Sequence, residues 1–333
     1  MEKSPGLPIE TFIDSVETVR DHFLPPVKDS EYQAMYNGKV TNKLVKTKTS
    51  DYKESQIEQL KLVNFNGRLE IDQGDYKVFI NQYRELTQGL ATTAKKLLDV
   101  FVTALTEQNE KRKSADIEVS LAEYMRIRGL KDEKEARKQI KRDLEAIASL
   151  YLEITHEPSR KNWMRYQVSG GAYGIKNGII KFRFSNEFFS LLVTYPIMPI
   201  NLETFLPNEN NYPNSYYFAR YIQEHKNMNY HHPNADIISV RKLLDSSPHM
   251  PKYEELGKAG QLRKRIIDPF ERDLSIYTFF TWHYCGVKGT DLEQPETYED
   301  FINANVKITF KDYPERVREI ETPKRRTSKK KEK

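Results

Sequence analysis

The most constraining feature of this 333-residue sequence is a helical pattern that begins at Thr92. Between Thr92 and Gln108 the apolar residues recur at intervals of three and four, which predicts a helix with one face packed on a core. A short β-rich run follows at residues 117–119, ahead of further helical segments. Few folds remain open to such a chain, because each element has to bury its apolar face against the others.

Two capping signals mark the starts of the next helices. Ser120, with a glutamate three residues later, opens a short second helix that Gly129 can end. Asp132, again with a glutamate three residues later, opens a third helix that continues to about residue 150. The spacing therefore predicts a helix, a strand, a helix, a tight turn and a further helix.

Two β-rich stretches complete this unit. One is the run at residues 151–155. The other is a hairpin in which residues 164–169 are expected to pair with residues 179–185, with the glycine-rich GGAYGIKNG at its tip. Three helices followed by a hairpin are the order of a winged helix-turn-helix domain, which we place at residues 89–195.

The predicted third helix separates its apolar residues from its basic ones. At about 100° per residue, one arc is apolar and a second arc, roughly 130° away, is basic. The apolar arc holds Ala136, Ile140, Leu144, Ile147 and Tyr151, and the basic arc holds Arg137, Lys138, Lys141 and Arg142. Four cations on the exposed side of a third helix suit entry into the major groove of DNA. A solvated, salt-bridged helix face is the alternative, because Glu133, Glu135 and Asp143 lie nearby.

The same order of elements recurs further along the chain. Residues 214–227 carry a helical stripe, Ser239 can cap a short second helix, and residues 261–277 form the third helix. Pro269 should kink that helix or delay its regular part, because proline lacks an N–H and crowds the preceding turn. Two aromatic runs, YTFFTWHY and ANVKITF, are expected to form the second wing, so that residues 214–315 make a second winged-helix domain.

The third helix of the second unit is divided in the same way. Its apolar arc holds Ile266, Ile267, Phe270, Leu274 and Tyr277, and its outward residues are Gln261, Lys264, Arg265 and Arg272. Arg263 falls near the apolar arc by its helical angle. At the tip of the first wing, Lys176 and Asn177 are candidate phosphate contacts, with ordinary turn residues as the alternative.

The remaining segments flank or join the two domains. Residues 1–88 are expected to be an N-terminal arm in which Asn66-Gly67 can turn a short hairpin, and residues 196–213 a linker with docked apolar residues. Residues 316–333 are expected to be a disordered basic tail. The last ten residues carry a net charge of +6 against +5 for the whole chain, so the remainder sums to −1. The tail either contacts phosphate or only keeps the chain in solution.

Composition excludes several classes of protein. The 38% hydrophobic content supports real cores, but no run approaches the roughly 18 apolar residues of a membrane span, and no signal peptide is evident. We therefore expect an intracellular protein. The single cysteine, Cys285, excludes an internal disulfide and a cysteine-based zinc cluster. No phosphate-binding glycine loop occurs, and the SGGAYG run lacks the helix that a dinucleotide site requires, so no cofactor is expected.

The histidines do not form the pattern of a nuclease. His231 and His232 are adjacent, and neighbouring residues of a strand point to opposite faces, whereas paired histidine ligands must share one face. His283 is expected to be a satisfied, partly buried histidine. A nicking relaxase stays open as an alternative and requires strand cleavage by a tyrosine.

The 20 Tyr and 16 Phe are interpreted mainly as packing residues, with stacking on unpaired bases as the alternative.

The stretch from Tyr216 to Phe310 resembles the second winged-helix domain of the plasmid replication initiators, the iteron-binding Rep proteins with tandem winged helices. The run RKRIIDPFERDL and the opening helix with its Tyr/Arg-Tyr pattern carry this resemblance. The first domain is similar to that family more loosely, through element order and its basic third helix. The resemblance implies binding to repeated origin sites, dimers that repress their own gene, and recruitment of a host helicase or its loader, without catalysis.

Together these patterns predict an α+β protein of two tandem winged helix-turn-helix domains. We expect a bacterial, cytoplasmic, nucleoid-associated initiator of plasmid or mobile-element replication that binds double-stranded DNA, is a candidate homodimer, and has no membrane or metal partner. A winged-helix transcriptional regulator without a replication role is the alternative. Several direct repeats beside an AT-rich stretch would favour the initiator, and one inverted repeat over a promoter the regulator.

Overall fold

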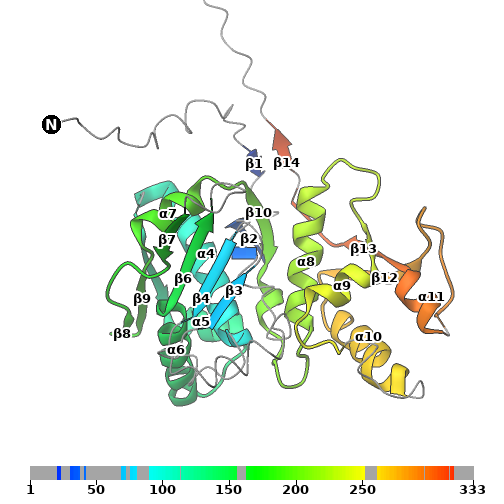
Figure 1. Ribbon diagram of the computed structural model, residues 1–333, viewed down its shortest axis with the longest axis horizontal. Coiled ribbons are helices and arrows are strands. Elements are labelled where there is room, and N and C mark those ends of the chain that lie inside the picture. The colour runs from blue at the N-terminus through cyan, green and yellow to red at the C-terminus, as the bar shows by residue number, and fades with distance from the viewer. Residues whose placement is uncertain are drawn as a thin grey trace, which may run out of the picture.

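The structure, a computed structural model, contains two helical units that lie side by side (Figure 1). It describes residues 21–23, 31–37, 41–42, 69–72, 76–80, 90–112, 114–155, 163–251, 261–295, 297–314 and 316–318. Helix α4 (Thr92–Arg112) is the central helix of the first unit, and α8 (Ser215–Met228) opens the second. The predicted mixture of helices and strands is therefore present.

The first unit begins with three helices in the predicted order. After α4 come β5 (Asp116–Ser120), α5 (Leu121–Arg128) and α6 (Glu133–Ala148). Ser120 caps α5 by accepting a hydrogen bond from the backbone N–H of Glu123, and Gly129 ends that helix with a left-handed φ of 61°. Asp132 caps α6 through the N–H of Glu135. Both predicted helix starts are confirmed.

The first wing differs from the predicted hairpin. It consists of β8 (Gly174–Lys176) and β9 (Ile179–Arg183), and β9 also pairs with β5. Between them, Asn177 and Gly178 have φ values of 52° and 72°, the left-handed conformation that a tight two-residue turn requires. This local signal closes the hairpin inside the GGAYGIKNG run. The predicted pairing of MRYQVS with IIKFRFS is therefore wrong, except for one isolated bridge between Ser169 and Phe184.

The MRYQVS run belongs to a second, antiparallel sheet with the order β3-β4-β6-β7. Its strands are β3 (Leu69–Asp72), β4 (Tyr76–Ile80), β6 (Leu150–Thr155) and β7 (Trp163–Gln167). Strands β6 and β7 follow one another along the chain, and such neighbours pair most readily. Because β4 pairs with β6, the sheet extends into the segment predicted as an arm. The predicted turn at Asn66-Gly67 lies outside the described residues.

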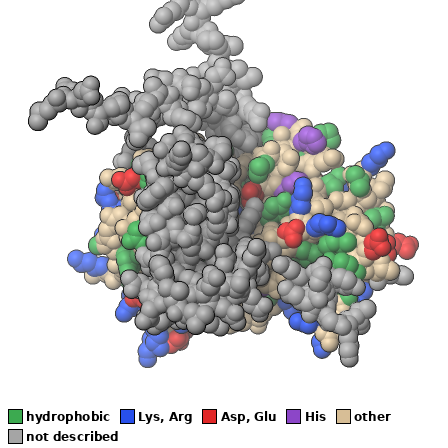
Figure 2. Space-filling view, in the orientation of Figure 1, with side chains coloured by type: hydrophobic (Ala, Val, Ile, Leu, Met, Phe, Trp, Pro, Cys, Tyr) green, Lys and Arg blue, Asp and Glu red, His purple; other side chains and the backbone are tan. Residues whose placement is uncertain are grey.

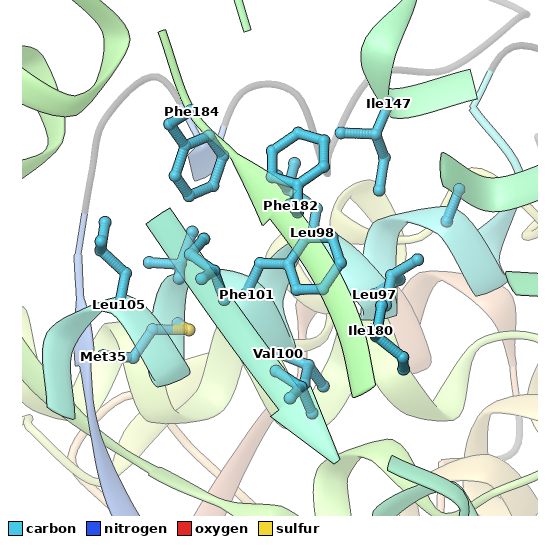
Figure 3. Packing of buried hydrophobic residues seen from close by; sticks show 14 of the residues in the cluster. Met35, Leu97, Leu98, Val100, Phe101, Leu105, Ile147, Ile180, Phe182 and Phe184 are labelled. Carbon is cyan, nitrogen blue, oxygen red and sulfur yellow. The ribbon is translucent and has the colours of Figure 1, made fainter. Parts of the chain in front are cut away.

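The core of the first unit lies against α4 (Figure 3). Leu97, Phe101 and Leu105 from α4 are fully buried, and Phe101 stacks on Phe182 of β9 with ring centroids 4.9 Å apart. Ile147 brings α6 into the same cluster. Each such side chain contributes about 1.5–3 kcal/mol when it is removed from water. The stripe predicted from Thr92 onwards is thus the face of the helix that holds the unit together.

The segment between the units is packed rather than free. It contains α7 (Asn186–Val193), β10 (Ile197–Asn201) and the 3-10 turn η2 (Leu202–Phe205). Met198 and Ile200 are buried in the first core, so the expected docking of apolar residues is confirmed. Strand β10 pairs with β2 (Tyr32–Tyr36), which comes from the predicted N-terminal arm.

The second unit shares with the first the order of helix, strand, short helix, third helix and two wing strands, but it has two additions and, among the described residues, no counterpart of β6 and β7. After α8 come β11 (Ile237–Ser239), α9 (Val240–Ser246), the π-helical turn η5 (Arg263–Ile267), α10 (Asp268–Leu274), β12 (Phe280–Cys285), α11 (Tyr298–Asn303) and β13 (Asn305–Phe310). The strands form one antiparallel sheet, β11-β13-β12. The additions are η5 and α11, and α11 lies inside the predicted wing loop, where Thr297 caps it. Phe270 makes edge contacts with Phe218 and Phe301 at the centre of the second core.

The two ends of the described chain meet in a short ribbon of β1 (Asp21–Phe23) and β14 (Arg316–Arg318). The tail predicted as disordered from residue 316 therefore begins with a strand, because these three residues pair with β1. Residues beyond 318 lie outside the described part. Among the described residues, no helix combines the length and apolarity that a membrane span needs.

Candidate nucleic-acid interface

Helix α6 presents its basic residues to solvent. Ala136, Ile140, Leu144 and Ile147 are buried, so the core side of the helix is the predicted one. On the other side, the exposed fraction of the Lys141 side chain is 78%, and Lys138 and Arg142 are also exposed. The Arg137 side chain is 42% exposed. The division into two arcs is therefore present in the structure, except that Tyr151 lies in β6, because α6 ends at Ala148.

Three of these cations pair with glutamates of the same helix. Arg137 lies 2.6 Å from Glu133 and Lys138 2.7 Å from Glu135, while Lys141 lies 4.0 Å from Glu145. Exposed pairs of this kind stabilise a helix by only about 0.3–0.5 kcal/mol. The salt-bridged face considered as an alternative is thus real, but it is weak enough to yield to a phosphate or a base edge.

Asp143 is not one of the acids of that face. It is 4% exposed and points inward, where one carboxylate oxygen accepts a hydrogen bond of 2.8 Å from the hydroxyl of Thr93. Its other oxygen has no partner among the described residues. Burial raises the pKa of Asp143 to about 7, although Arg128 opposes the shift.

Lys134 was missed by the sequence argument. At about 100° per residue it falls inside the arc of the four predicted cations, one turn before Arg137. It is exposed in the structure. The same helical geometry could have found it, because the Asp132 cap already places Lys134 in the first turn of the helix.

At the tip of the first wing, Lys176 and Asn177 are both exposed, in the turn that joins β8 to β9. The predicted wing tip is therefore at the expected position. The left-handed backbone of Asn177 belongs to the turn and would be needed with or without DNA.

The third helix of the second unit is irregular for a local reason. Pro269 has no N–H to donate, and the preceding residues form a π-helical turn in which the N–H of Asp268 bonds to the carbonyl of Arg263. The regular helix begins only at Asp268, as expected from the proline. Ile266 and Ile267 are buried, while Gln261, Lys264 and Arg265 are exposed.

Two arginines of this helix have partners. Arg272 lies 2.6 Å from the buried carboxylate of Asp273, with its guanidinium over the ring of Tyr212. Its side chain is still 49% exposed. Arg263 was expected near the core but is 56% exposed and lies 3.3 Å from Asp268, because the wider π-helical turn rotates it outward.

The two third helices lie on the same side of the molecule. Figure 1 shows α6 and α10 at the lower edge, with the β8–β9 tip beside α6. Figure 2, in the same orientation, shows Lys and Arg side chains at the lower left and lower right. A DNA duplex laid along this edge could meet both helices.

Three histidines that the sequence singles out lie in a turn or a strand, with local contacts. His231 and His232 lie in the turn after α8, where His231 has a φ of 72° and His232 accepts a hydrogen bond from the N–H of Asn234. His283 lies 3.0 Å from Asp291 and is 45% exposed, so it has a partner but is less buried than expected. The described residues contain no group of three or more His, Cys, Asp or Glu suited to a metal ion. Cys285 is buried, which raises the pKa of its thiol.

Comparison with known proteins identifies the first unit. Residues 76–201, from β4 to β10, match the model of the family described as Initiator Replication protein, WH1. This match covers less than half of the 333 residues, and it shows that the first unit is similar to the first winged-helix domain of the replication initiators. The predicted resemblance is thereby confirmed, and the match favours an initiator over a transcriptional regulator. The match ends before Tyr216, so the resemblance drawn for the second unit stays a prediction.

Two solved structures are similar to the chain in part. The Pi initiator protein in complex with iteron DNA is 11% identical, with a TM-score of 0.48, over 85% of this chain and 98% of that one. Domains 2 and 3 of RctB are 10% identical, with a TM-score of 0.45, over 73% of this chain and 90% of that one. No curated protein matches the chain.

Proposed function

We propose that the chain is a replication initiator with two tandem winged-helix domains, and that it reads one stretch of double-stranded DNA with both of them. The observation that carries the proposal is the placement of α6 and η5–α10 on one edge of the molecule, each with its apolar side buried and its cations exposed. A third helix of a helix-turn-helix unit reads base edges in the major groove, with its N-terminal residues closest to the bases. Two such helices on one chain would lengthen the recognised sequence.

In the first unit, four cations of α6 would contact DNA, joined by exposed Lys134 at the N-terminal end of the helix. The four are Arg137, Lys138, Lys141 and Arg142. Their glutamate partners would be released on binding, at the small cost of an exposed pair. Lys176 and Asn177 of the wing would contact phosphate beside the groove.

In the second unit, three exposed residues lie just before the regular part of the helix: Gln261, Lys264 and Arg265. This is the N-terminal end of the third helix, and the N-terminal residues of such helices contact base edges. Arg272 would contact phosphate, because its pairing with Asp273 fixes its position while leaving half of the side chain exposed.

The targets we propose are repeated elements at the replication origin of a bacterial plasmid or related mobile element. The basis is the initiator family of the first unit together with the resemblance of the second unit to the iteron-binding Rep proteins. The same proposal includes recruitment of host replication proteins, such as a helicase or its loader. It also includes a homodimeric form and a site of action on cytoplasmic DNA.

The test is fluorescence anisotropy with labelled duplexes that tile the DNA around the protein's own gene, at physiological salt with competitor DNA. Two variants probe the helices: Arg137→Ala/Lys141→Ala and Lys264→Ala/Arg265→Ala. A matched control, Lys226→Ala/Lys311→Ala, removes two positive charges near the C-terminal ends of α8 and β13. The loop that follows α8 lies at the edge opposite α6 and α10 (Figure 1).

We expect tight binding to a repeated element. Each double variant should lose about 100-fold in affinity, because a good base contact contributes about 1–3 kcal/mol. The control should lose less than about threefold, since distant charges are screened at this salt. Equal losses in all three variants, or binding that ignores sequence, would contradict recognition through the two helices.

A further inference from the structure

The two units are joined through a buried cluster of charged and polar side chains between α4 and α8. Asp99 of α4 and Arg220 of α8 are 0% and 1% exposed, and their Oδ2 and Nε atoms lie 2.6 Å apart. Arg220 donates hydrogen bonds to both oxygens of that carboxylate, and the hydroxyl of Tyr216 donates a third, of 2.7 Å. Separating the two helices would leave both charges buried without a partner, which is strongly unfavourable in an interior that water does not reach, so this cluster fixes α8 against α4.

The N-terminal arm contributes to the same cluster. Asn42 accepts a hydrogen bond of 2.8 Å from Arg220 and donates one of 2.7 Å to Asn37, and both asparagines are buried. Strand β2, just before them, bridges the two cores. Its residue Tyr32 packs edge-on against Phe279 in the second core, whereas its Met35 is buried in the first core.

The connector is held from both sides. Glu209 lies 2.9 Å from Lys96 of α4 and also accepts a hydrogen bond from Arg128 of α5. Glu203 accepts hydrogen bonds of 2.8 and 2.9 Å from the backbone N–H and hydroxyl of Thr278 in the second unit. Helix α8 itself spans the boundary, because Tyr216 and Tyr217 belong to the first core and the next residues to the second.

We propose that Asp99, Arg220, Tyr216 and Asn42 are positioning residues that hold the two DNA-reading helices at one separation. They touch no DNA themselves. With the separation fixed, the chain recognises two half-sites only at one spacing along the duplex, and the N-terminal arm becomes part of the specificity. This inference rests on the proposed reading of DNA by both units, and it assigns the arm and the α4–α8 contact a role in site selection.

The first test needs no DNA. Spin labels on cysteines introduced by Ser190→Cys in α7 and Asp245→Cys in α9, one in each unit, report the distance between the units in the full chain. Both positions are exposed, while Cys285 is buried. We expect one narrow distance distribution for the otherwise unchanged chain. Asp99→Asn should broaden it strongly, and the milder Tyr216→Phe and Asn42→Ala should broaden it less.

The second test uses the origin element in its natural form and with 5 bp, about half a helical turn, inserted between the two protected halves. For the wild type we expect the insertion to cost about 100-fold in affinity or more, the avidity that a second linked contact supplies. For Asp99→Asn we expect about tenfold weaker binding to the natural site, because preorganisation is lost, and less than about threefold further loss on insertion.

Asp236→Asn is the matched control, because it breaks the 2.6 Å pair with Lys226 inside the second unit and leaves the α4–α8 contact intact. It should keep the narrow distribution and the full insertion penalty. If Asp99→Asn does not fold, Tyr216→Phe and Asn42→Ala decide the question. Either an unchanged distance distribution or an unchanged insertion penalty in the folded variants would overturn the proposal. Absence of site-specific binding by the wild type would instead count against the proposed function and leave the distance result standing.

Discussion

The two third helices each contain one buried aspartate that contacts the start of the first helix of its own unit. In α6 this residue is Asp143, which accepts a hydrogen bond from Thr93 in the first turn of α4. In α10 it is Asp273, which accepts bonds of 2.9 and 2.8 Å from the backbone and side chain of Asn214, the residue before α8. The two units thus use the same device to set the angle between their first and third helices.

The two aspartates differ in how well their charge is compensated. Asp273 is also paired with Arg272 at 2.6 Å, whereas one oxygen of Asp143 has no partner among the described residues. A buried carboxylate that no cation contacts directly loses its hydration, and the attraction of Arg128 compensates only in part, which is why the pKa of Asp143 rises to about 7. The same contact therefore stabilises one unit as a charged pair and the other mainly as a neutral hydrogen bond.

The largest effect on the free energy of unfolding should come from removing the buried carboxyl group of α6, that of Asp143. Asp143→Asn keeps an acceptor for Thr93 but cannot ionise. In the wild type the folded pKa, about 7, exceeds the unfolded value near 3.9, so the folded state holds the extra proton between these values and stability falls as pH rises. Above pH 7 the loss is complete, and it amounts to as much as about 4 kcal/mol.

Asp143→Asn should therefore raise the free energy of unfolding at pH 8 and have little effect at pH 4, as measured by urea denaturation across that range. Asp116→Asn, which removes an exposed pair with Arg183 of the first wing, is the control and should change the free energy of unfolding by less than about 1 kcal/mol. A loss of stability at pH 8 would show that the charged form of Asp143 is the stabilising one.

In the second unit the corresponding substitution should lower the free energy of unfolding rather than raise it. Asp273→Asn removes the charge that Arg272 pairs with and weakens the acceptor for Asn214, so it should destabilise the protein by about 3 kcal/mol at pH 8. Urea denaturation at one pH is sufficient to measure this. If both asparagine variants shift stability in the same direction, the contrast between the two helices is wrong.

The contrast between the units also shows what the sequence could reveal. Caps, stripes and the effect of Pro269 depend on neighbours along the chain, and these predictions are confirmed from Ser120 to α10. The pairing of β6 with β7 was missed, because several aromatic runs competed for the same partners. The charged cluster was missed for a different reason: Asp99 and Arg220 are 121 residues apart, and a charged residue in a helix is normally exposed.

The candidate site was predictable to the extent that helical geometry decides which side chains face outward. All four cations of α6, and Gln261, Lys264 and Arg265 before α10, are on the expected side. The outward rotation of Arg263 depends on a π-helical turn, which changes the angle per residue that the prediction assumed. The ion pair of Arg272 with Asp273 lies in the regular helix, and helical angles alone do not predict it.

A third prediction tests whether that irregular turn matters for DNA. Pro269→Ala restores an N–H that can bond to the carbonyl of Arg265, so η5 should wind into a regular helix and rotate Lys264 and Arg265 away from their present direction. We expect about tenfold weaker binding to the target duplex, equal to about 1.4 kcal/mol. Stability should change by less than about 1 kcal/mol, because proline near the start of a helix is well tolerated.

Anisotropy on the natural site measures this effect, and Pro248→Ala, outside the helices, serves as the proline control. Unchanged affinity in Pro269→Ala would mean that the direction of Lys264 and Arg265 does not limit recognition.

The smallest expected effect lies on α6, where glutamates hold the cations. Glu133→Gln/Glu135→Gln removes the ion-pair partners of Arg137 and Lys138. These two side chains then contact DNA without first breaking an ion pair. Two pairs of about 0.3–0.5 kcal/mol each correspond to about a three- to fivefold gain in affinity. The gain should shrink at high salt, because screening already weakens the pairs.

Asp300→Asn in α11 removes one exposed carboxylate without touching a basic residue of either third helix, and it should leave affinity unchanged. A gain of the same size in that control would mean that net charge alone, and not the release of the α6 cations, sets the affinity.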